Sequence, residues 1–165
     1  MDNKTIYALS TVCGKSGVAV VRISGDDAVS AVRKMTNLPA DLKPRYAYFS
    51  ALRHPVTRET LDHALVLYFK APHSFTGENV VEFQIHGSRA VVNSVLDALA
   101  AFSSFRLAEP GEYSKRAFYN GKMDLTEAEG LADLIDAETS EQQKYAMRQM
   151  EGGLKNLYED WREKL

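Results

Sequence analysis

The chain has 165 residues, of which 45% are hydrophobic, and a formal net charge of −2 at pH 7. This length and composition predict one domain, or a domain with an appendage, whose core folds without metal or disulfides. Tight binding to nucleic acid by this chain alone is disfavoured, because such binding depends on many basic groups that neutralise phosphates.

The single cysteine, Cys13, excludes an internal disulfide and fits a reducing cytosol. We interpret it as a small turn residue rather than a nucleophile. The first residues have the pattern of neither a signal peptide nor a transit peptide. No apolar run approaches the roughly 20 residues that a membrane-spanning helix needs. The sequence therefore predicts a cytoplasmic protein without a membrane segment.

Strand and helix signals alternate over the first 120 residues. β-Branched and apolar residues predict strands at 18–23, 46–52, 64–69, 80–86 and 106–108. Apolar residues at helical spacing predict helices after Asp27 and after Ser88, and a short helix at 112–119. Residues 1–120 are therefore expected to form an α+β domain.

The pattern changes after residue 120, where strand propensity falls and proline is absent. Asp124 and Glu127 have the spacing of a capping box, and Thr139 offers a second helix start. Residues 121–165 are therefore expected to be helical. The apolar stripe of the second helix continues to Leu165, past a weak point at Gly152. We expect that stripe to pack on something outside this chain.

The run Gly14-Lys15-Ser16 resembles the end of a phosphate-binding loop but does not complete one. That motif needs a glycine where this chain has Leu9, and a helix directly after the serine. A strand signal follows instead, so we expect residues 14–16 to form a tight turn that leads from an earlier strand into the strand at 18–23. The other G-domain signatures, Asp-x-x-Gly and Asn-Lys-x-Asp, do not occur in the sequence.

Strand parity singles out two charged residues. In 80–86, Glu82 alternates with the apolar residues and so lies on the opposite face, either as a solvent-exposed side chain or as the wall of a pocket. Arg22 shares the parity of Val18 and Val20, where core residues are expected. It either reaches solvent at the strand end or needs an anionic partner.

Metal binding and covalent catalysis have no support in the sequence. The four histidines lack the spacing of zinc ligands, and no hydrolase or metalloprotease motif occurs. We therefore predict no metal site and no catalytic residues.

Several ordered blocks carry a resemblance to a known family: residues 17–25 (Gly-Val-Ala-Val-Val-Arg-Ile-Ser-Gly), 74–87 (opening Ser-Phe-Thr-Gly-Glu), 108–118, and 120–137 (opening Asn-Gly-Lys-Met-Asp-Leu). Together they resemble the N-terminal part of the MnmE (TrmE) family of tRNA-modification GTPases. The resemblance implies a mixed sheet with flanking helices, like the folate-binding domain of the glycine-cleavage T protein, and then the start of a helical domain.

The resemblance also implies a function. Domains of this family bind a tetrahydrofolate, described as 5-formyltetrahydrofolate, and form a homodimer. The folate-contacting arginine, glutamate and lysine of the family fall on Arg22, Glu82 and Lys122. By itself, Lys122 would be an ordinary solvated loop lysine.

In the whole proteins of this family, the resemblance further implies a G domain that binds GTP, Mg and K. These proteins modify the wobble uridine of tRNA together with the flavoprotein MnmG (GidA). Because the G-domain signatures are missing here, GTPase activity is not expected of this chain alone. Two other functions stay open: a dimerisation scaffold that binds no ligand, and an independent folate-dependent one-carbon enzyme.

Overall fold

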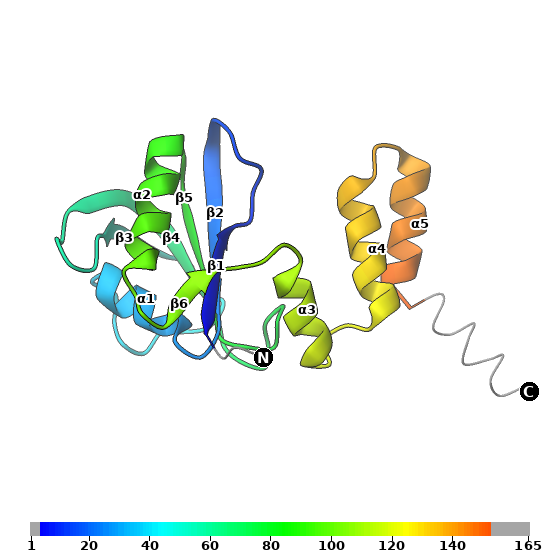
Figure 1. Ribbon diagram of the computed structural model, residues 1–165, viewed down its shortest axis with the longest axis horizontal. Helices are drawn as coiled ribbons and strands as arrows, with labels where there is room; N and C mark the ends of the chain where they lie inside the picture. The colour runs from blue at the N-terminus through cyan, green and yellow to red at the C-terminus, as the bar shows by residue number, and fades with distance from the viewer. Residues whose placement is uncertain (1–3, 153–165) are drawn as a thin grey trace, which may run out of the picture. The chain divides into compact units, whose positions relative to one another are not determined.

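The computed structural model describes residues 4–152, and within that range six strands form one mixed sheet (Figure 1). The strand order is β3-β4-β5-β2-β1-β6. Strand β1 pairs in parallel with β6, whereas the other neighbours are antiparallel. The strands are β1 (Thr5–Leu9), β2 (Ser16–Ser24), β3 (Tyr48–Arg53), β4 (Thr60–Phe69), β5 (Val80–Gly87) and β6 (Phe105–Leu107).

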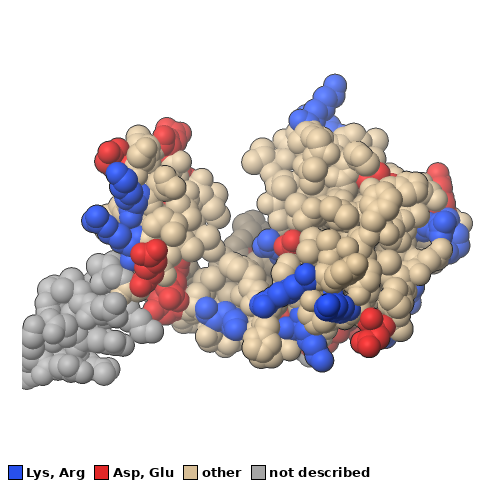
Figure 2. Space-filling view, turned by 180° about the vertical axis from the view of Figure 1, so that it is seen from behind, with Lys and Arg blue, Asp and Glu red and all other residues tan. Residues whose placement is uncertain are grey.

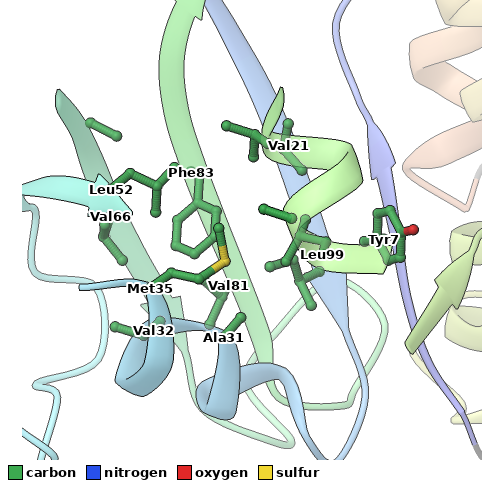
Figure 3. Packing of buried hydrophobic residues seen from close by; sticks show 14 of the residues in the cluster. Tyr7, Val21, Ala31, Val32, Met35, Leu52, Val66, Val81, Phe83 and Leu99 are labelled. Atoms are coloured by element: carbon green, nitrogen blue, oxygen red, sulfur yellow. The ribbon is translucent and has the colours of Figure 1, made fainter. Parts of the chain in front are cut away.

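Two helices, α1 (Ala28–Met35) and α2 (Arg89–Ala100), pack on one face of this sheet and enclose the core (Figure 1). Figure 3 shows Met35 of α1 beside Val81 and Phe83 of the central strand β5, and Leu99 of α2 between Val21 and Tyr7. All six side chains are buried. An α+β fold with a mixed sheet and flanking helices is thus confirmed.

The face on which the helices pack corrects one expectation. In β2 the buried side chains are Ala19, Val21 and Ile23, whereas Val18 is 56% exposed. Arg22 does share a face with Val18, but that face is the open outer face of the sheet and not the core. Both faces of β2 are apolar at the level of sequence, so periodicity could not tell which of them the helices cover.

The predicted strands and helices occur, with shifted ends. Strand β4 begins at Thr60 rather than residue 64, because its first four residues include only one apolar side chain, Leu61, and so carry no apolar pattern. Residues 10–15 connect β1 to β2, and β2 begins at Ser16. Ser16 is therefore the first residue of a strand, and the segment lacks the helix of a phosphate-binding loop.

The chain divides into two compact units between Tyr113 and Ser114, ahead of the boundary near residue 120 that the sequence suggests. Helix α3 (Glu112–Tyr119) contains this division, and α4 (Leu125–Asp136) and α5 (Ser140–Met150) follow. Capping boxes begin α4 at Asp124 and α5 at Thr139. The apolar stripe expected beyond residue 152 lies outside the described residues.

Helices α4 and α5 pack closely at Gly130. A Cβ atom placed there would lie 2.9 Å from Cβ of Gln149 and 3.1 Å from Cγ of Met150. Glycine therefore allows the two helices to approach each other more closely than any larger residue would. Within residues 4–152, none of the helices combines the length and the apolar character needed to cross a membrane.

Candidate functional site

Arg22 and Glu82 meet at the centre of the sheet, on its outer face. They are directly opposite each other on the antiparallel strands β2 and β5. Nε of Arg22 donates a hydrogen bond of 2.9 Å to Oε1 of Glu82. The side chains are 28% and 16% exposed, so the pair is partly shielded from water but can still be reached from solvent. Of the two alternatives left open for Arg22, solvent or an anionic partner, the structure shows a partner, Glu82, beside a side chain that is still partly exposed.

The pair has further hydrogen-bond donors and acceptors besides the one bond that joins it. Among residues 4–152, neither the terminal nitrogens of Arg22 nor Oε2 of Glu82 forms a further hydrogen bond. A guanidinium has five N–H donors and a carboxylate has two acceptor oxygens, so the other described residues engage only a small part of this capacity. The pair thus offers a donor and an acceptor side by side to a ligand.

Two aromatic rings flank the guanidinium of Arg22. Its central carbon lies 5.7 Å from the ring centroid of Phe75 and 5.7 Å from that of Tyr113, within the range of cation–π contacts. The hydroxyl of Tyr113 donates a 2.7 Å hydrogen bond to the backbone carbonyl of Arg22. Both the side chain and the backbone of Arg22 are therefore in contact with aromatic residues that are distant in sequence.

The loop that carries Phe75, residues 70–79, is fastened at its base. Oδ1 of Asn79 accepts hydrogen bonds from the hydroxyl of Tyr68 at 2.9 Å and from the backbone N–H of Ala71 at 3.1 Å. Burial raises the pKa of the Tyr68 hydroxyl, which keeps it protonated as the donor. One loop end is thereby tied to the other.

The middle of the same loop is fastened to strand β2. Ser24 donates to Oε2 of Glu78 at 2.7 Å, and its hydroxyl lies 2.7 Å from that of Thr76. Ser24 and Thr76 are both completely buried. Because Ser24 lies on the same strand as Arg22, two residues further along, these bonds fix the loop beside the Arg22–Glu82 pair.

Lys122 belongs to the second compact unit, unlike Arg22 and Glu82. Its backbone N–H donates to the carbonyl of Ala117 at 2.8 Å, in the turn between α3 and α4, and its side chain is exposed. The structure therefore brings together two of the three expected site residues, and describes the third within its own unit.

The other polar side chains on the outer face of β5 differ in their surroundings. Gln84 is half-buried, whereas the ring of His86 is 70% exposed and lies 2.7 Å from the carboxylate of Asp62. The solvent-exposed alternative considered for this face therefore holds for His86, whereas Glu82 takes part in a cross-strand polar pair.

A separate cavity of about 400 Å³ lies beside the start of α1. Asp26, Arg33, Tyr68 and Lys70 are among its lining residues, whereas Arg22 and Glu82 are not. In the part of the chain from residue 4 to 152, no cluster of three His, Cys, Asp or Glu side chains could hold a metal ion. Figure 2 shows basic and acidic side chains scattered among uncharged surface on the face in view.

Sequence reasoning missed the two aromatic residues. Phe75 and Tyr113 lie within blocks that carry the family resemblance, but neither has a spacing that relates it to Arg22. Their contacts with Arg22 depend on how the loop at 70–79 and the start of α3 return to the sheet. The direct opposition of Arg22 and Glu82 was equally hidden, because strand register is not readable from two separate strands.

Comparisons with known proteins agree with the resemblance. Residues 5–122 match the family model described as GTP-binding protein TrmE N-terminus, and residues 125–165 match the MnmE helical domain. A tRNA modification GTPase MnmE of Parvibaculum lavamentivorans is 54% identical over 162 residues, which are 98% of this chain and 37% of the relative.

Two further relatives show the same coverage. The 5-taurinomethyluridine-[tRNA] synthase subunit GTPB3, mitochondrial, of Danio rerio is 53% identical over 98% of this chain and 32% of its own length. An MnmE of Wolbachia sp. subsp. Drosophila simulans is 50% identical over 99% of this chain and 36% of its own length. The chain thus spans about a third of the length of these relatives, and the family model covers most of the chain. It follows that this chain belongs to the TrmE N-terminus family.

Proposed function

We propose that this chain binds a tetrahydrofolate, such as 5-formyltetrahydrofolate, at the Arg22–Glu82 pair. The observation that carries the proposal is the pair itself: a partly shielded guanidinium and carboxylate, joined by one hydrogen bond and otherwise without hydrogen-bond partners among the described residues. Family membership supports it, because the resemblance assigns folate contacts to both residues.

The chemistry of the pair fits the pterin end of a folate. A pterin presents N–H donors next to a ring carbonyl. Glu82 can accept from the N–H groups through Oε2, while the terminal nitrogens of Arg22 can donate to the carbonyl. Such charge-assisted bonds are roughly twice as strong as neutral ones. Oε1 of Glu82 already accepts from Arg22. The pair can therefore bind a ligand edge that carries both N–H donors and a carbonyl acceptor.

We further propose that the chain acts as the N-terminal module of a tRNA-modifying GTPase of the MnmE type. The names of the relatives support this role, since they describe tRNA modification GTPases and a tRNA-modifying synthase subunit. In the whole protein, this module would form the homodimer, a G domain would use GTP with Mg and K, and MnmG would be the partner in modifying the wobble uridine.

Calorimetric titration of the chain with 5-formyltetrahydrofolate tests the folate proposal. We expect saturable binding at about one ligand per chain. Replacing Glu82 with glutamine removes the charge but keeps the shape, and should weaken binding at least tenfold, since a charged hydrogen bond contributes about 1.5–3 kcal/mol. The circular dichroism spectrum should not change, because the residue is outside the core.

The matched control is Gln84→Ala, which alters the same outer face of the same strand, two residues from Glu82. We expect this variant to bind like the unaltered chain. If the unaltered chain does not bind folate, the scaffold function is favoured. If Glu82→Gln binds unchanged while folded, folate binds elsewhere. The resemblance also assigns a folate contact to Lys122, so we propose that Lys122→Ala weakens binding as well.

A further inference from the structure

The direction in which the terminal nitrogens of Arg22 point decides what the guanidinium can bind. Arginine has a long side chain that loses up to about 2 kcal/mol of rotamer freedom when it is fixed. The hydrogen bond from Nε to Glu82 restrains the guanidinium at one atom only. A further restraint on its plane would fix the direction of the terminal nitrogens.

The rings of Phe75 and Tyr113 supply that restraint from two different parts of the chain. Each centroid lies 5.7 Å from the central carbon of the guanidinium. Arginine favours such contacts because its flat, weakly hydrated cation fits an aromatic face. Two rings together limit the guanidinium more than either ring alone.

Both rings are themselves held in place. Tyr113 donates its hydroxyl proton to the backbone carbonyl of Arg22, which sets the distance between its ring and strand β2. Phe75 lies in the loop that Asn79 closes and that Ser24 holds through Thr76 and Glu78. Phe75 is 37% exposed, so it has little role in the core. Its contact with Arg22 is therefore not explained by packing in the core.

We propose that Phe75 and Tyr113 are positioning residues that hold the guanidinium of Arg22 so that its terminal nitrogens face the ligand. This role rests on the folate-binding function proposed above. The two rings restrain Arg22 before the ligand arrives, which lowers the entropy lost on binding. Phe75 and Tyr113 thus act on affinity through Arg22.

The first test needs no ligand. In the nitrogen-15 NMR spectrum of the chain, the Nε–H signal of Arg22 is identified by its loss in Arg22→Lys. In Phe75→Leu, which keeps an apolar side chain but removes the ring, its exchange with water should become about two- to fivefold faster, in line with the strength of a part-exposed cation–π contact. Phe75→Trp should restore slow exchange, because tryptophan is the best cation–π partner.

The matched control is Phe49→Leu, which removes a ring that is 69% exposed on strand β3 of the same sheet. We expect no change in the Arg22 signal in this variant. Unchanged exchange in Phe75→Leu, or a failure of Phe75→Trp to restore it, would overturn the proposal. Tyr113→Phe keeps its ring but loses the hydroxyl bond, and should give a smaller increase than Tyr113→Leu.

The second test measures affinity for 5-formyltetrahydrofolate in the same variants. Phe75→Leu should bind two- to fivefold more weakly, Phe75→Trp should regain affinity, and Phe49→Leu should bind normally. If the unaltered chain binds no folate, the proposed function fails, while the exchange rates still decide whether the rings position Arg22. Normal affinity of Phe75→Leu beside a folate-binding parent would contradict the positioning role.

Discussion

At the scale of single residues, the Arg22–Glu82 pair contributes little to folding stability. The pair is partly exposed, and such ion pairs typically contribute 0–1 kcal/mol because desolvation and side-chain ordering offset the attraction. Its position between two central strands, with two aromatic rings beside it, fits the proposed ligand-binding role. Substitutions in the pair should change binding far more than unfolding.

A second residue-scale feature, Asp62, makes stability depend on pH. Burial raises the pKa of its carboxyl group, but the backbone N–H and ring of His86 and the backbone N–H of His63 lower it by more, so the pKa lies below its ordinary value of 3.8. The backbone N–H of His86 donates to Oδ2 at 2.7 Å. Because this pKa is lowered, the Asp62 carboxylate stabilises the folded state at pH values above its ordinary pKa of 3.8. This contribution disappears as the pH falls through the lowered pKa.

We therefore expect Asp62→Asn to lower the free energy of unfolding at pH 7 by about 0.5–1 kcal/mol, the range of a partly exposed pair. The difference from the unaltered chain should shrink as pH falls below 4. Urea unfolding at pH 7 and pH 3 measures both values. Asp41→Asn, an exposed loop change, serves as control. An equal loss at both pH values would show that the carboxylate charge is not the cause.

At the scale of elements, local patterns were sufficient to predict the helix starts and the strand alternation. Asp124 with Glu127 predicted a capping box, and the side chains bond as that motif requires. Alternation in β5 correctly placed Glu82 on the face of the strand away from the buried Phe83. These signals are readable because each depends only on residues a few positions apart.

The remaining features of the site depend on contacts that are distant in sequence. The sequence-based expectation of which face of β2 is buried was wrong, because Val18 and Val20 are as apolar as Val21. The pairing of Arg22 with Glu82 requires the register of two strands separated by about sixty residues. The return of Phe75 to Arg22 requires the hydrogen bonds that fasten its loop.

Helix packing in the second unit gives a prediction of its own. Gly130→Val would place side-chain atoms within 3.1 Å of Gln149 and Met150, so α4 and α5 must separate. Overpacking of this kind typically costs 1–3 kcal/mol. We expect a lower melting temperature of this unit, followed by circular dichroism at 222 nm. Glu129→Ala, an exposed change one residue away, should not lower it. Equal melting of Gly130→Val and the unaltered chain would contradict this close packing.

At the scale of the whole molecule, the two units are proposed to have different tasks. The sheet unit holds the Arg22–Glu82 pair that we propose binds the ligand, and the helical unit matches the beginning of the MnmE helical domain. The near-neutral charge and the scattered basic side chains in Figure 2 favour weak contact with tRNA by this chain alone. Recognition of tRNA is therefore proposed for the whole protein, of which the chain spans about a third in its relatives.

The most direct test of the central claim is a double-mutant cycle on folate affinity with Arg22→Lys, Glu82→Gln and the double variant. If the two residues read the ligand as one unit, each single change should weaken binding about tenfold or more. The double change should then cost little more than the larger single change, giving a coupling of about 1 kcal/mol or more. Strictly additive losses would show that the two residues act separately, and unchanged affinity in all three would place the folate site elsewhere.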